Sequence, residues 1–229
     1  MKHSILSVAL LTAICSTGWG STVFTEGDNN QGDAGGMINS ANITYGSGPL
    51  TDIIGRLTDI TGGADMYEIF IGSPTTFSAT TEGDTSLGAK AIVNPAIYLF
   101  KANGDGLFGN DNISGSTTQA AIPVGTTSSL TAGLYYILIA ASGNLPENTN
   151  GTPIFGDLTN TTTVAAGSSS PARLKQYGPG AAPTTADAGK GYDIVLTGAD
   201  FAQATPEPTT VALTGLGIAA LAYRLRRKS

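Results

Sequence analysis

Alternation of apolar and polar residues along the middle of the chain predicts short β-strands. The clearest example is 65–71, where a period of two places Tyr67, Ile69 and Ile71 on one face. Residues 192–197 repeat the pattern. A further strand is predicted at 52–58, and weaker patterns predict strands at 22–24, 41–45, 75–80 and 120–124.

Two other segments, 96–100 and 134–140, are nearly continuous apolar runs of aromatic and branched residues. Such runs are typical of central strands that are buried on both faces. Turns rich in Gly, Asn and Asp separate the segments, and long stretches of helical period are missing. We therefore expect an all-β fold, a two-sheet antiparallel β-sandwich.

One long segment, 142–189, departs from the regular spacing of strands and turns. It is rich in Gly, Pro, Ser, Thr and Asn, and a structureless loop of this length is uncommon inside a domain. We expect a long loop that is functional, mobile, or contains weak strands near 153–158 and 172–177.

The N-terminus has the order of a secretory signal peptide. Basic residues at 1–3 precede the apolar stretch 5–15, and small residues follow before Ser21. This order predicts an N-terminal signal helix and removal of residues 1–20.

The C-terminus combines a proline-flanked acid, an apolar stretch and a basic end. The 17 residues of 209–225 span about 25 Å as a helix, slightly less than a typical hydrocarbon core. We expect a C-terminal membrane-anchor helix whose basic end stays in the cytoplasm. That basic end consists of Arg224, Arg226, Arg227 and Lys228.

The order of Pro206, Glu207 and Pro208, an apolar helix and an Arg-rich end resembles the PEP-CTERM sorting domain of Gram-negative bacteria. The resemblance implies that an exosortase recognises the three motif residues and cleaves the chain. It implies an exported protein that the helix holds transiently in the inner membrane. Its destination is then the cell surface or an extracellular matrix, often with exopolysaccharide. The chain divides into a signal peptide, a secreted domain and a sorting segment, at 1–20, 21–204 and 205–229.

A second resemblance covers residues 45–140. Four segments resemble, in order, the bacterial pre-peptidase C-terminal type of β-sandwich: 50–57, 65–69, 97–107 and 130–136. This resemblance implies a non-catalytic, jelly-roll-like accessory domain. Lys101 departs from it, because an acidic residue often follows the Leu-Phe pair in that family.

The charge of the secreted part excludes one class of partner. The chain has 11 cationic and 17 acidic side chains, and five of the cations and one acid lie in the terminal segments. Six cations and 16 acids therefore lie between Ser21 and Thr205. Such a domain repels nucleic acid and anionic membrane surfaces, so we expect no nucleic-acid partner.

The chain has one Cys, one His and one Trp, and Cys15, His3 and Trp19 all lie in the expected signal peptide. The secreted part therefore lacks disulfides, thiol chemistry and imidazole-based catalysis or metal binding. We expect a non-enzymatic protein without a cofactor, with a scaffolding or adhesion role and polysaccharide as a candidate ligand.

A calcium-stabilised adhesin is one alternative. Calcium accepts carboxylate and amide oxygens along a flexible turn, and the candidate ligands are Asn103, Asp105, Asn110 and Asp111. The competing interpretation is a hairpin in which Asn and Asp stabilise the turn backbone.

A carboxylate-dependent extracellular polysaccharide hydrolase is the other alternative. Glycoside hydrolysis needs two acids about 5 to 10 Å apart, and the arrangement to test is Glu68 with Asp59 or Asp65. Exposed tyrosines can also stack on sugar rings, although alternation predicts that Tyr67 and its counterparts in other strands, Tyr98 and Tyr192, pack in the core.

Overall fold

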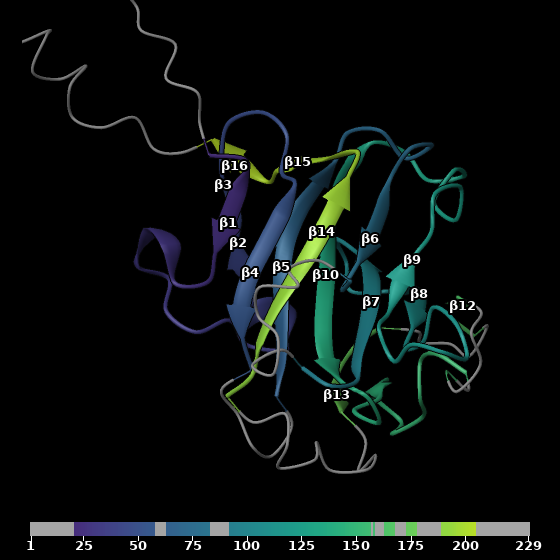
Figure 1. Cartoon of the computed structure of the whole chain (residues 1–229). Helices are drawn as coiled ribbons and strands as arrows, with labels where there is room; N and C mark the ends of the chain where they lie inside the picture. The colour runs from purple at the N-terminus through teal and green to yellow at the C-terminus, as the bar shows by residue number, and fades with distance from the viewer. Residues whose placement is uncertain are drawn as a thin grey trace, which may run out of the picture.

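A computed structural model describes residues 21–57, 63–82, 92–156, 158, 163–167, 173–177 and 189–204. These residues form β-strands in several sheets (Figure 1), together with two short 3-10 helices, Asp28–Asn30 and Ile38–Ser40. The predicted all-β class is confirmed. The predicted signal helix and membrane-anchor helix lie outside the described residues. Within the part of the chain that the structure describes, no helix combines the length and apolar character needed to span a membrane.

One sheet has five strands in the order β1-β4-β14-β6-β9. Its strands are β1 (Val23–Thr25), β4 (Asp52–Arg56), β14 (Gly191–Thr197), β6 (Ser78–Thr80) and β9 (Ala121–Ile122). The central strand β14 is the longest and pairs with β4 and β6 along its two edges.

The other large sheet has seven strands, with the order β12-β8-β7-β10-β5-β15 and with β2 also paired to β5. Its strands are β12 (Val164–Ala165), β8 (Gly106–Asn110), β7 (Pro95–Lys101), β10 (Gly133–Ala141), β5 (Ala64–Ile71), β15 (Ala199–Phe201) and β2 (Asn42–Ile43). Two small pairs complete the fold: β11 (Pro146–Glu147) with β13 (Gln176–Tyr177), and β3 (Tyr45–Gly46) with β16 (Gln203–Ala204).

The strand pairing corrects the expectation of a purely antiparallel arrangement. Three of the pairs in the described residues are parallel: β1 with β4, β2 with β5, and β16 with β3. Parallel pairs need long connections, because the chain must return to the end at which the first strand began. All three involve strands of only two or three residues near the ends of the described chain.

A hydrophobic cluster draws side chains from both large sheets. Ile53 and Ile194 enter it from the five-stranded sheet, and Ile69, Leu99 and Ile137 enter it from the seven-stranded sheet. In Figure 1, β4 and β14 pass in front of β5 and β10. The alternation predicted for 65–71 is confirmed, because Tyr67, Ile69 and Ile71 all belong to this cluster.

A second hydrophobic cluster covers part of the outer face of the seven-stranded sheet. Tyr98 and Phe100 of β7 contact Phe155 from the long segment after β10, with ring centroids 5.1 and 5.6 Å apart. Ile154 and Leu174 join the same cluster. The segment expected as a long loop thus covers this face with its described parts, which explains why β7 and β10 are apolar on both sides.

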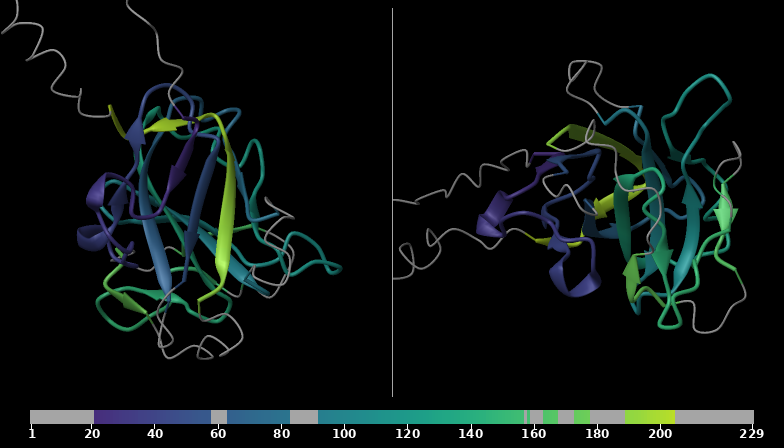
Figure 2. Two further views of the ribbon diagram at one scale, coloured as in Figure 1. Left: turned by 60° about the vertical axis from the view of Figure 1, so that its left-hand side comes forward. Right: turned by 90° about the horizontal axis from the view of Figure 1, so that it is seen from below.

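The two ends of the described chain lie together. The Thr51 N–H donates to the Thr22 carbonyl (2.8 Å), and the adjacent Leu50 N–H donates to the Ala199 carbonyl (3.0 Å). Figure 2 shows the purple start and the yellow end of the described chain on the same side of the domain.

Candidate functional site

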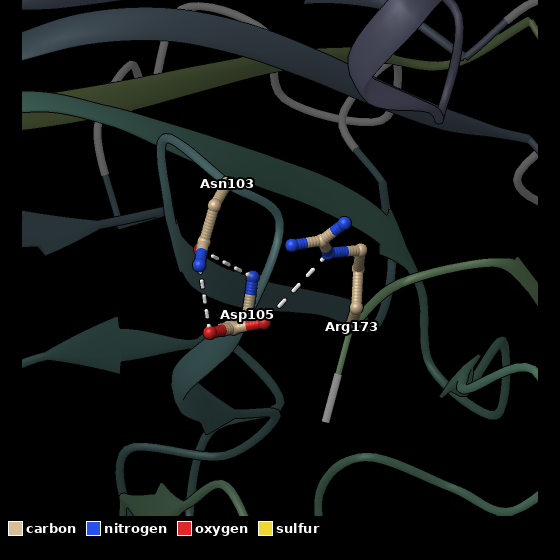
Figure 3. Close-up of polar contacts among 3 residues, drawn as sticks. All are labelled: Asn103, Asp105 and Arg173. Carbon is tan, nitrogen blue, oxygen red and sulfur yellow. Dashed lines mark hydrogen bonds and ion pairs between the residues drawn. The ribbon is translucent and has the colours of Figure 1, made fainter. Parts of the chain in front are cut away.

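The turn between β7 and β8 contains the first two predicted calcium ligands. Asn103 Nδ2 donates to Asp105 Oδ2 (2.8 Å), and the Asp105 N–H donates to Asn103 Oδ1 (3.1 Å), as Figure 3 shows. Gly104 between them has φ +90°, a conformation that glycine adopts at little cost. The side chains of the turn therefore stabilise its own backbone.

Arg173 of the covering segment reaches this turn. Its Nε lies 3.9 Å from Asp105 Oδ1 (Figure 3), and the neighbouring Leu174 N–H donates to the Gly104 carbonyl (3.0 Å). The Arg173 side chain is 58% exposed, so the ion pair contributes only about 0.2–1 kcal/mol. The positively charged Arg173 side chain thus lies beside Asp105, one of the expected calcium ligands.

Asn110 and Asp111 lie at the opposite end of β8. Asn110 Oδ1 accepts from the Ala121 N–H (2.8 Å), and Asp111 accepts from Ser142 Oγ (2.7 Å) and from the Asn112 amide. Asn110 lies five positions after Asp105, about 16 Å along the strand at about 3.3 Å per residue, so no single ion contacts all four residues. The structure does not bring the four together, and calcium binding at either end of β8 stays a prediction. In the ranges described above, no group of three or more His, Cys, Asp or Glu side chains is placed to hold a metal ion.

The carboxylates considered for glycoside hydrolysis point in opposite directions. Asp65 is 3% exposed and faces the five-stranded sheet, where it accepts from the Tyr192 hydroxyl (2.6 Å). Glu68 faces outward and accepts from the Tyr136 hydroxyl (3.4 Å). The structure therefore does not pair Glu68 with Asp65, and Asp59 lies outside the described residues.

A buried hydrogen-bonded network joins the two large sheets. The hydroxyl of Tyr67 in β5 contacts the hydroxyl of Tyr192 in β14, and Tyr192 in turn donates to Asp65. Glu26, which follows β1, bonds to Tyr67 and accepts from the N–H groups of Ala34 (2.9 Å) and Arg56 (2.8 Å). Sequence reasoning missed Glu26, because no periodic pattern marks a residue just after a three-residue strand.

The electrostatics of this network favour protonated hydroxyls. Burial raises the pKa of both Tyr67 and Tyr192 well above the ordinary value, and the nearby Asp65 and Glu26 raise it further. Burial also raises the pKa of Glu26. Phenols of this kind act as hydrogen-bond donors, so the network fastens the sheets together and supplies no activated nucleophile.

The tyrosines predicted to pack in the core do so. Tyr67 and Tyr98 are fully buried and Tyr192 is 3% exposed. Tyr45, Tyr136 and Tyr177 are half-buried.

The last described strand brings the chain to the predicted sorting motif. β16 ends at Ala204 and is paired with β3, and the Gln203 N–H donates to the Thr44 carbonyl (3.1 Å). One residue, Thr205, separates Ala204 from the motif. The motif itself, Pro206, Glu207 and Pro208, and the basic end, Arg224, Arg226, Arg227 and Lys228, lie outside the described residues.

Comparison with known proteins identifies the C-terminal segment. Residues 204–228 match the family described as the PEP-CTERM protein-sorting motif. The resemblance inferred from the order of the C-terminal residues is confirmed, and the motif indicates an exported protein that is sorted by exosortase, a membrane enzyme. No curated protein and no solved structure matches the chain.

Proposed function

We propose that this protein is a non-enzymatic component of the cell envelope or extracellular matrix, with a scaffolding or adhesion role and polysaccharide as its ligand. The observation that carries the proposal is the sorting motif at 204–228, which begins at the last described strand of a β-sheet domain. The domain is then the exported cargo, and the C-terminal segment directs it through the membrane to the surface.

The domain is proposed to be a two-sheet β-sandwich. The shared hydrophobic cluster supports this arrangement, because the inner faces of both large sheets supply its side chains. A sandwich leaves its outer faces and loops free for contacts, while the tyrosine network holds the two layers in register.

The non-enzymatic role is supported by residue chemistry. The secreted part has neither Cys nor His. Asp65 and Glu68 lie on opposite faces of β5, and the raised pKa values of Tyr67 and Tyr192 keep these hydroxyls protonated. The remaining acids give the domain a negative charge that suits a hydrated extracellular polymer.

Replacement of the motif tests the sorting step. In the producing bacterium, a Pro206→Ala, Glu207→Ala, Pro208→Ala variant should stay uncleaved in the inner membrane, while the unmodified chain reaches the surface fraction. Pro123→Ala, at an exposed proline of the domain, is the matched control and should be sorted normally. Normal surface delivery of the triple variant would contradict the proposal.

Enzymatic activity is tested separately. Purified chain incubated with exopolysaccharide of the producing bacterium should release no reducing ends. Release that disappears in Glu68→Gln, Asp65→Asn or Asp59→Asn variants would replace the scaffolding role with hydrolysis.

A further inference from the structure

A patch of apolar and acidic side chains lies on the outer face of the seven-stranded sheet. It is built by two rows of residues that are paired across neighbouring strands. The outer-face patch consists of Leu134, Phe70 and Asp200 in one row and Tyr136, Glu68 and Ile43 in the next.

The strand register places these six side chains on one surface. Tyr67, Ile69 and Ile71 of β5 point into the core between the sheets, so Glu68 and Phe70 point outward. Paired residues on adjacent strands have Cβ atoms about 5 Å apart, and rows two residues apart are separated by about 7 Å. The six side chains therefore extend about 10 Å across the strands and about 7 Å along them, an area of about two sugar rings.

The patch borders the region that the long segment covers. Tyr136 packs against the edge of the second hydrophobic cluster, while Leu134 is 40% exposed. Phe70, Glu68 and Asp200 are half-buried. Each row therefore includes side chains that are partly accessible to solvent.

Two carboxylates flank the aromatic rings. Asp200 lies over Gly72, where the Cβ atom of any other residue would overlap its Oδ2. The Glu68 carboxylate accepts a long hydrogen bond, 3.4 Å, from the Tyr136 hydroxyl. Ionised carboxylates accept hydrogen bonds and donate none, so the patch complements a ligand rich in donors.

We propose that the outer-face patch binds a glycan chain of neutral or amino sugars. The rings pack on Phe70 and Tyr136, and their hydroxyl or ammonium groups donate to Glu68 and Asp200. Chains of uronic acids are excluded, because their carboxylates face two like charges and the six residues include no cation. This inference rests on the proposed polysaccharide association. It specifies where on the domain the polysaccharide binds and that the bound sugars are neutral or positively charged.

Calorimetric titration of the full-length chain in detergent tests the site with three probes. Cellohexaose and a chitosan hexamer should bind, and an alginate hexamer should not. Phe70→Ala should weaken binding about tenfold, as truncation of an aromatic anchor does at many interfaces. Glu68→Gln should weaken the chitosan hexamer more than cellohexaose, because only the former carries ammonium groups. The matched control is Val124→Ala, which truncates a side chain that is 62% exposed and outside the patch.

A second variant keeps the test decisive if Phe70→Ala fails to fold. Leu134→Asp replaces an exposed apolar side chain of the patch with a third carboxylate. It should weaken binding of cellohexaose and favour the chitosan hexamer over cellohexaose, with an unchanged melting temperature. Unchanged binding by both variants would overturn the site. Binding of the alginate hexamer alone would also overturn the site. That result would still support polysaccharide association at another place on the protein. Self-association or vesicle binding that Leu134→Asp removes would assign the patch to a second copy or to a membrane and overturn the glycan proposal.

Discussion

At position 55 of β4, the side-chain volume is limited by a hydroxyl group on the neighbouring strand β14. A Cβ atom there would overlap the Tyr192 hydroxyl, while the Gly55 backbone itself is outside the left-handed region. That hydroxyl bonds to Asp65 and Tyr67 and thereby connects the two sheets. The requirement for glycine at this position therefore comes from packing.

Gly55→Ala should lower the free energy of unfolding by about 1–3 kcal/mol, since a Cβ atom that overlaps the buried Tyr192 side chain forces neighbouring groups to move. Urea denaturation measures the change. Gly133→Ala is the matched control, because a Cβ at that strand position meets nothing within 4 Å. An equal loss of unfolding free energy in the two variants would show that replacing either strand glycine has this effect. The Tyr192 hydroxyl would then not be its cause.

Glu26 should give stability a pH dependence. Burial raises its folded-state pKa above the unfolded value of about 4.3, so folding takes up a proton in the interval between the two. The stability that protonated Glu26 contributes is fully present below its unfolded-state pKa. It is lost as the pH rises through its folded-state pKa. Glu26→Gln should remove this decline from denaturation curves measured across that interval. An identical decline in the variant would assign it to another group.

Neither of these residues was predicted from the sequence. Glu26 gains its role from Tyr67, which lies 41 positions further along the chain, and Gly55 gains its role from Tyr192. The Glu26 contact depends on how the two sheets face each other, and the Gly55 contact depends on the register of β4 with β14. Local periodicity contains neither kind of information.

At the scale of elements, local pattern was informative where strands are long. The strands β5, β7, β10 and β14 match the predicted segments to within one residue at each end. β8 was not predicted, because Gly106 and Gly109 suggest a turn. It forms a strand through pairing with β7 on one side and β12 on the other. The covering role of the long segment was likewise missed, since its apolar residues are scattered among Gly, Ser and Thr.

Phe155→Ala should lower the free energy of unfolding by about 3–5 kcal/mol, the usual cost of truncating a buried aromatic ring. Phe155 is 2% exposed and packs on Tyr98 and Phe100. Val124→Ala, at a side chain that is 62% exposed, serves as the control. A loss below 1 kcal/mol for Phe155→Ala would contradict the covering role of the segment.

Chelation tests the calcium alternative at the two ends of β8. Asn103 and Asp105 bond to each other, and Arg173 lies beside Asp105. EDTA should therefore leave the melting temperature unchanged, and added calcium should leave it unchanged as well. A melting temperature that falls with EDTA and recovers with calcium would establish a metal site and favour the calcium-stabilised adhesin.

At the scale of the whole molecule, the chain joins a β-sheet domain to a sorting segment with one residue between β16 and the motif. The order of three short elements at the C-terminus predicted this segment, and the family match confirms it. The parallel pairs were not predicted, because they join segments far apart in the sequence. The connection from β2 to β5 contains the predicted strand β4, but local pattern does not state which strands lie side by side.

The central claim is that the domain is exported cargo and that both terminal segments serve its delivery. Intact-mass spectrometry of the chain recovered from the surface fraction of the producing bacterium tests this claim directly. We predict a species that begins near Ser21 and lacks the apolar segment after Pro208. A full-length species of 229 residues, recovered from the cytosol with both ends uncut, would contradict the account.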